Sequence, residues 1–187
     1  MLRLEKQCRD AASNQIGQTK MAAPKLAALE TWFRQNGGYL NPSVHISYSE
    51  DVGAYFRTDS EVPAGTRILT VPHHLAISNL NAQVDDAFPV FGSHAEEFTV
   101  EALTFFYLAS QWIHRETSFW RPYLDTLPSP DQGYETPLWF DEEDMKWLEG
   151  TDLHPTSIVR EAIWRKYWQE GLEVLKSADV DVTPYTW

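Results

Sequence analysis

Three groupings of ionisable side chains could do chemistry in this sequence: His73-His74, Glu96-Glu97 and the acidic run of residues 141–144. Adjacent histidines on a strand point to opposite faces, so the histidine pair cannot easily bind one metal ion. Both acidic clusters stand at predicted helix starts, where carboxylates favour the helix dipole, and this explains them without an acid–base pair. The single cysteine, Cys8, excludes a thiolate cluster, and no Ser/His/Asp or Cys/His arrangement is recognisable. We therefore predict no metal site and assign no catalytic residue.

A glycine turn is the segment that could receive a ligand through its backbone. The run DVGAYF (residues 51–56) follows a polar bend and leads into a predicted strand. Glycine at position 53 would let another group approach the main chain closely. Neither the Rossmann nor the Walker phosphate-binding pattern is present. A single glycine before a strand is more often only a turn, so the residues alone leave both interpretations open.

Composition limits the class of protein. The chain has 187 residues, 43% of them hydrophobic, which suits one or two domains with a real core. Its net charge of −12 disfavours binding to nucleic acid and would attract basic partners. No apolar run has the length of a membrane span. One cysteine allows no intramolecular disulfide, which is compatible with a reducing compartment, and we expect the cytoplasm, with the nucleus as an alternative.

The first half of the sequence predicts a helix followed by strands. Residues 24–35 form an amphipathic pattern that begins at a proline and stops at Asn36-Gly37-Gly38. Residues 44–48, 54–58 and 67–71 then read as strands, with a turn at 63–66. We expect these strands to form one small antiparallel sheet within residues 39–78.

The second half predicts helices. Ser93 with Glu96 is typical of a capping box, and it would start a helix that reaches Arg115 and is apolar on most sides. Asp141 would cap a short acidic helix that ends at Gly150.

A longer helix is expected after Thr156 as its cap. Its apolar stripe would contain Val159, Ile163, Tyr167 and Val174. Thr183-Pro184 is a further helix start, close to the last residue of the sequence. A one-turn helix is not stable alone, so we expect the chain to be cut from a longer protein.

Several motifs occur in an order that resembles a known family. The tract around Trp120, Pro122 and Tyr123 predicts a rigid aromatic corner that packs a core. The full set comprises Trp32-Phe33, Gly37-Gly38, Gly53, Pro63, Gly65, the segments 68–78 and 118–128, Thr136–Trp139, and Leu148–Leu153. Together these residues resemble the SET-domain protein methyltransferases of the Rubisco large-subunit methyltransferase type. That group includes fungal ribosomal-protein lysine methyltransferases and the actin-histidine methyltransferase.

The resemblance implies an α+β fold in which a twisted β structure is interrupted by a helical insertion. We expect this chain to be the N-terminal part of that SET-domain fold, followed by the insertion and truncated. The implied organisation is a mobile polar leader at residues 1–20, a β region with its leading helix at 21–90, and a helical insertion region at 91–187.

The resemblance also implies S-adenosylmethionine as the cofactor. In the family, the backbone around the glycine turn holds the methionine and adenosyl parts of this cofactor. Carried over to this sequence, the cofactor-binding residues are Glu50, Val52, Gly53, Ala54 and Tyr55. The family's first turn glycine is Asp51 here, so a side chain stands where the family has none.

The family's later Asn-His motif, its late tyrosine and its C-terminal helical substrate domain have no counterpart in this sequence. We therefore expect a fragment of a protein-lysine N-methyltransferase, inactive alone and binding S-adenosylmethionine weakly or not at all. Its substrate would be a basic protein such as a ribosomal protein, with neither nucleic acid nor membrane as a partner and the oligomeric state open. The alternative is a non-catalytic SET-like interaction module. Exposed apolar side chains are expected at residues 67–71 and at Trp187.

Overall fold

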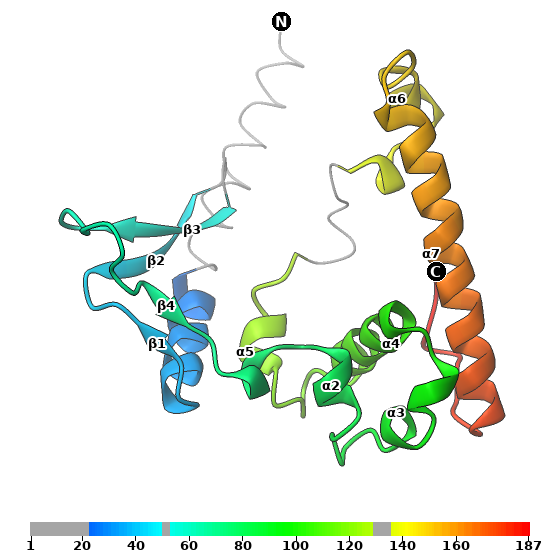
Figure 1. The fold of residues 1–187 in the computed structure, drawn as a ribbon, viewed down its shortest axis with the longest axis horizontal. Helices are drawn as coiled ribbons and strands as arrows, with labels where there is room; N and C mark the ends of the chain where they lie inside the picture. The colour runs from blue at the N-terminus through cyan, green and yellow to red at the C-terminus, as the bar shows by residue number, and fades with distance from the viewer. Residues whose placement is uncertain (1–22, 50–52, 129–135) are drawn as a thin grey trace, which may run out of the picture. The chain divides into compact units, whose positions relative to one another are not determined.

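The computed structural model describes residues 23–49, 53–128 and 136–187, which cluster into two compact units (Figure 1). The strand unit holds the described residues up to Ala76 together with Phe119–Leu127. The helical unit holds Ile77–Ser118 and the described residues from Pro128 to the end. The domain bounds expected at residues 20 and 90 stay predictions. Within the described ranges, no helix combines the length and apolar character needed to cross a bilayer.

Four short strands lie in the strand unit: β1 (Tyr39–Leu40), β2 (Val44–Ser49), β3 (Gly53–Thr58) and β4 (Leu69–Thr70). β2 and β3 form an antiparallel hairpin that runs from the pair Val44↔Thr58 to the pair Ser49↔Gly53. This confirms the predicted strands at 44–48 and 54–58.

The prediction of one sheet is wrong, because β4 pairs antiparallel with β1 and not with the hairpin. The predicted strand at 67–71 is also shorter. The Asn41 backbone N–H donates to the Ile68 carbonyl at 2.8 Å, which continues the β1–β4 register by one residue. The next contact, at 3.2 Å, comes from the Asn41 side-chain amide to the Arg67 carbonyl.

The opening helix extends through residues 23–35 and stops where the sequence predicts. The Gly38 N–H donates to the Phe33 carbonyl at 2.9 Å and the Gly37 N–H to the Arg34 carbonyl at 3.2 Å, which is the Schellman pattern. Gly37 has a φ of 82°, and a Cβ on Gly38 would overlap the Phe33 ring. Each glycine is therefore needed for a different reason, one conformational and one steric.

The predicted aromatic corner packs the strand unit. Trp120 is buried, and its ring lies 5.8 Å from that of Trp32 on the opening helix, while Phe119 lies 5.3 Å from Trp32. The short helix α5 (Arg121–Leu124) follows at once, with Pro122 in its first turn and Leu124 fully buried. These contacts join the opening helix to a segment almost ninety residues later in the chain.

The helical unit contains five helices and two 3₁₀ turns among its described residues. They are α2 (Asn79–Ala82), α3 (Val90–Ser93), η2 (Ala95–Glu97), α4 (Val100–Ile113), η4 (Pro137–Trp139), α6 (Glu142–Lys146) and α7 (Leu153–Ser177).

The start of α4 differs from the sequence prediction. Ser93 ends α3 and does not cap a helix that reaches Arg115. The cap is Thr99, whose hydroxyl accepts a hydrogen bond from the Ala102 N–H at 3.1 Å. Phe98 is extended and buried in the core, so the chain turns between the two helices and the capping box does not form.

One face of α4 is fully buried and most of its other residues are half-buried, in agreement with the expectation of a helix covered on most sides. The buried positions are Ala102, Leu103, Phe106, Tyr107, Ser110 and Gln111. The polar members are paired: Tyr107 Oη and Gln111 Nε2 both donate to Asp85 Oδ2, at 2.6 and 2.9 Å. Phe105 lies on the other side and Val100 is the first residue of the helix, and both are exposed.

Of the two N-terminal caps predicted for α6 and α7, only the one for α6 is confirmed. Asp141 caps α6 as predicted, accepting from the N–H groups of Glu143 and Asp144 at 2.8 and 2.9 Å.

Thr156 does not cap α7, which begins at Leu153 after Asp152. Thr156 instead donates its hydroxyl to the Asp152 carbonyl at 2.6 Å within the first turn, since the chain enters the helix directly from the turn at Gly150.

α4 and α7 pack against each other where α7 has no side chain (Figure 1). The Phe106 ring of α4 lies against Gly171, so that a Cβ there would overlap the ring, and it stacks on Trp168 at 4.6 Å with an interplanar angle of 18°. Phe106, Val174 and Leu175 are buried together in the main core.

Tyr185 covers this core from the last residues of the chain. Ser110 Oγ donates to the Phe106 carbonyl at 2.7 Å, so Tyr185 Oη donates to Ser110 Oγ, also at 2.7 Å. The predicted helix start at Thr183-Pro184 is only a turn. The packing of Tyr185 holds this segment in place without a helix.

The first test concerns the contact at Gly171. Alanine there gains about 1 kcal/mol of helix propensity but must overlap the Phe106 ring, so we expect a net fall of about 1–2 kcal/mol in the free energy of unfolding. In a Phe106→Leu background, Gly171→Ala should instead be neutral or stabilising. Urea unfolding of the four proteins measures both effects. Stabilisation by Gly171→Ala in the wild-type background would contradict the contact.

A second test uses alkaline pH. Burial raises the pKa of the Tyr185 phenol, and the Ser110 hydroxyl, which can turn to donate to the phenolate, opposes part of that rise. A raised folded-state pKa contributes stability below the unfolded value of 10.0, and this contribution is lost as the pH rises through the folded value. Unfolding free energies measured from about pH 8 to 11 should therefore fall more steeply for the wild type than for Tyr185→Phe. Equal slopes would mean that the phenol is solvated.

Candidate functional site

The glycine turn closes the β2–β3 hairpin. Gly53 pairs with Ser49 at the end of the ladder and has a φ of 76°, a conformation that side chains rarely adopt. Among the described residues, nothing lies within 4 Å of a Cβ built on Gly53. The glycine is thus required by its backbone conformation, and no described residue covers the main chain on that side.

The two predicted residues that follow Gly53 extend this surface along β3. Ala54 pairs with Tyr48 and Tyr55 with Ser47, and both are exposed. Neighbouring side chains on a strand point to opposite faces, so Ala54 and Tyr55 cannot contact a ligand from the same face. Glu50 and Val52, the other two predicted cofactor-binding residues, lie outside the described residues, as does Asp51.

Apolar side chains are exposed in the strand unit near β4 and, in the helical unit, at Trp187, as expected. Ile68 and Val71 are 41% and 49% exposed, and Trp187 is 55% exposed. Tyr55 and Phe56 leave aromatic rings exposed on both faces of β3, with Phe56 53% exposed. The sequence did not predict this exposure. Both faces of the hairpin can therefore accept further packing.

The ionisable groupings have structural partners. His73 and His74 lie in the 3₁₀ turn η1 (His73–Leu75) and not in a strand, and His74 Nε2 lies 3.1 Å from the Asn36 carbonyl. Glu97 Oε1 lies 2.7 Å from His94 Nδ1. Among the described residues, no three His, Cys, Asp or Glu side chains gather as metal ligands would.

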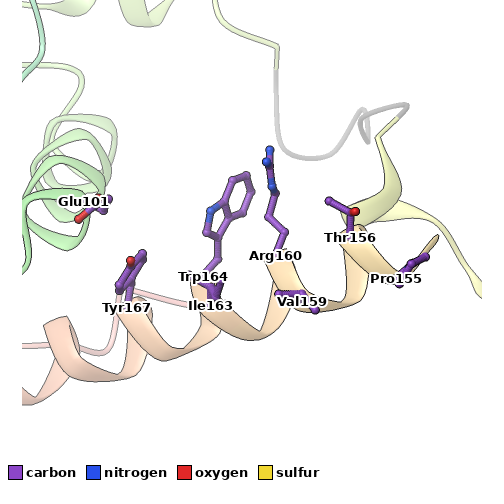
Figure 2. Close-up of a pocket in the computed structure, with 8 residues that line it drawn as sticks. All are labelled: Glu101, Pro155, Thr156, Val159, Arg160, Ile163, Trp164 and Tyr167. Carbon is purple, nitrogen blue, oxygen red and sulfur yellow. The ribbon is translucent and has the colours of Figure 1, made fainter. Parts of the chain in front are cut away.

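A concave surface lies on α7, in the helical unit. Figure 2 shows this groove, which encloses about 560 Å³ along the N-terminal half of the helix. Its lining residues are Glu101, Pro155, Thr156, Val159, Arg160, Ile163, Trp164 and Tyr167. Val159, Ile163 and Tyr167 belong to the stripe that the sequence predicts. The contribution of Arg160 and Trp164 was missed, because the sequence does not show which helix faces stay uncovered.

No family model matches the chain. Curated relatives do: the actin-histidine N-methyltransferase of Callithrix jacchus is 28% identical over 126 residues, and that of Homo sapiens is 27% identical over 126 residues. In each case the match covers 66% of this chain and 20% of the relative. The chain therefore spans about a fifth of the length of these relatives.

Solved structures match most of the chain. The SET domain of LSMT bound to lysine and AdoHcy superposes with a TM-score of 0.64 at 20% identity, covering 83% of this chain and 32% of that one. Rubisco LSMT bound to AdoMet gives 0.64 at 21% identity, covering 87% and 35%. The described helices and strands therefore have the fold of part of a SET domain of the Rubisco large-subunit methyltransferase type.

Proposed function

We propose that this chain forms part of an S-adenosylmethionine-dependent protein methyltransferase. The supporting observation is that 83–87% of the chain shares its fold with SET-domain structures bound to AdoMet, AdoHcy or sinefungin. The chain spans only about a third of those structures, at 32–35% of their length, so the complete activity needs residues that these 187 do not supply.

The glycine turn is the part of the described chain that suits the cofactor. Gly53 has no Cβ, and no described residue fills the space where one would stand, so a ligand can approach its N–H and carbonyl groups directly. Ala54 and Tyr55 continue that backbone along β3. Glu50 and Val52 complete the proposed set by resemblance. When bound, the cofactor supplies a methyl group activated on a sulfonium, and these residues bind and orient it.

We propose a side-chain nitrogen of a protein as the methyl acceptor. The relatives are named for a histidine of actin, and two of the matched structures hold lysine or monomethyllysine. A lysine in a basic segment, such as one of a ribosomal protein, is our more specific hypothesis, and only the net charge of −12 supports it. The proposal places none of the groups that act on the acceptor nitrogen within this chain.

The test is an NMR titration of the chain with S-adenosylmethionine. We expect saturable amide shifts at Gly53, Ala54 and Tyr55 with a dissociation constant in the millimolar range, because much of the pocket's contact area is absent. Gly53→Ala should abolish these shifts, since alanine strains the turn and fills the open space.

Gly65→Ala is the matched control. Gly65 also has a positive φ, of 81°, and also has nothing within 4 Å of a built Cβ, so it carries the same strain outside the proposed site. Equal losses in the two variants would contradict a site at Gly53, as would an absence of shifts at about 10 mM cofactor. Micromolar binding with turnover would refute the proposal that the site is incomplete.

A further inference from the structure

The N-terminal half of α7 leaves apolar side chains in solvent. Ile158, Val159 and Ile163 are 52%, 58% and 43% exposed, whereas Val174 and Leu175 in the C-terminal half are buried against α4. The helix is thus anchored at one end and uncovered at the other within the described chain. Contiguous apolar surface of this kind is typical of a binding site for another protein segment.

The uncovered half has a defined shape. In Figure 2 the side chains of Arg160 and Trp164 project from α7 to the same side, and Glu101 of α4 lies near Tyr167 at the other end of the groove. Trp164 is held in place by an edge contact with Phe105 of α4, with ring centroids 6.1 Å apart. A partner would therefore meet a positioned indole ring and would not have to order it first.

The charged side chains of α7 and the groove indicate which kind of partner fits. Arg165 is paired with Glu161 at 2.8 Å and Lys166 with Glu170 at 3.6 Å, but among the described residues Arg160 has no acidic partner. Glu101 stands in the first turn of α4, where the helix dipole already accounts for an acid. Arg160 is the cation left to pair with an incoming carboxylate, beside the apolar surface.

We propose that this groove binds an acidic amphipathic helix of a partner protein. Its apolar face would pack on Val159, Ile163 and Trp164, and one of its carboxylates would pair with Arg160. Helices that dock in grooves bury side chains spaced three and four residues apart, which matches the groove's stripe along α7. A basic residue of the partner near Glu101 would fix its direction. This proposal concerns the helical unit alone and does not depend on the proposed methyl transfer.

Two synthetic helices of about 18 residues serve as probes, with the same leucine stripe and either glutamate or lysine at the remaining positions. Fluorescence anisotropy of the labelled peptides measures their binding to the full chain. The net charge of −12 attracts the lysine peptide, so tighter binding of the glutamate peptide would report a local basic site. We expect the glutamate peptide to bind more tightly, and Arg160→Glu to weaken it by about fivefold or more.

Lys176→Glu is the matched control, since it makes the same charge change on an exposed residue at the other end of α7 and should leave the binding unchanged. Ile163→Ser should also weaken the glutamate peptide, and circular dichroism checks that each variant is folded. Stronger binding of the lysine peptide, or no effect of Arg160→Glu, would overturn the proposal. Self-association of the chain that Ile163→Ser abolishes would also overturn it, because a second copy would then occupy the groove.

Discussion

The helical unit depends on the close approach of the Phe106 ring to the backbone of α7 at Gly171. The ring is fully buried and stacks on Trp168, so the two helices can be no further apart without opening a cavity in the core. This contact fixes the C-terminal half of α7. The N-terminal half then extends beyond the core, which is why Val159 and Trp164 remain at the surface.

Among its described residues, the strand unit buries its β2–β3 hairpin at one end only, through Val44. Two-stranded sheets are only marginally stable in water, and both β2–β3 and β1–β4 are of this kind. The buried side chains that the structure describes in this unit are Leu26, Leu40, Val44, Leu75, Trp120 and Leu124, and none of them lies near the Gly53 end of the hairpin. The proposed cofactor-binding turn at Gly53 therefore stands in a segment with few buried neighbours, and such segments open at a lower free-energy cost than a packed core.

Helix ends and caps that depend on neighbouring residues could be predicted from the sequence, whereas tertiary packing could not. The double glycine at 37–38 and the cap at Asp141 were predicted because each acts within a few residues. Ser93 was predicted as a cap because its capping-box pattern is local, but with Phe98 buried in the core the helix starts later, with Thr99 as its cap. The glycine turn was likewise identifiable from its residue type. The groove at Arg160 was not, since it depends on which faces of α7 the rest of the chain leaves open.

We propose that the turn at Gly53 is the cofactor-binding turn of a SET-type methyltransferase. Photo-crosslinking of S-adenosylmethionine to the chain, followed by mass-spectrometric mapping, would locate the bound cofactor. We expect the label to be concentrated in the segment of residues 44–58 and to be displaced by S-adenosylhomocysteine. Label spread over the chain, or concentrated in the helical unit, would contradict it.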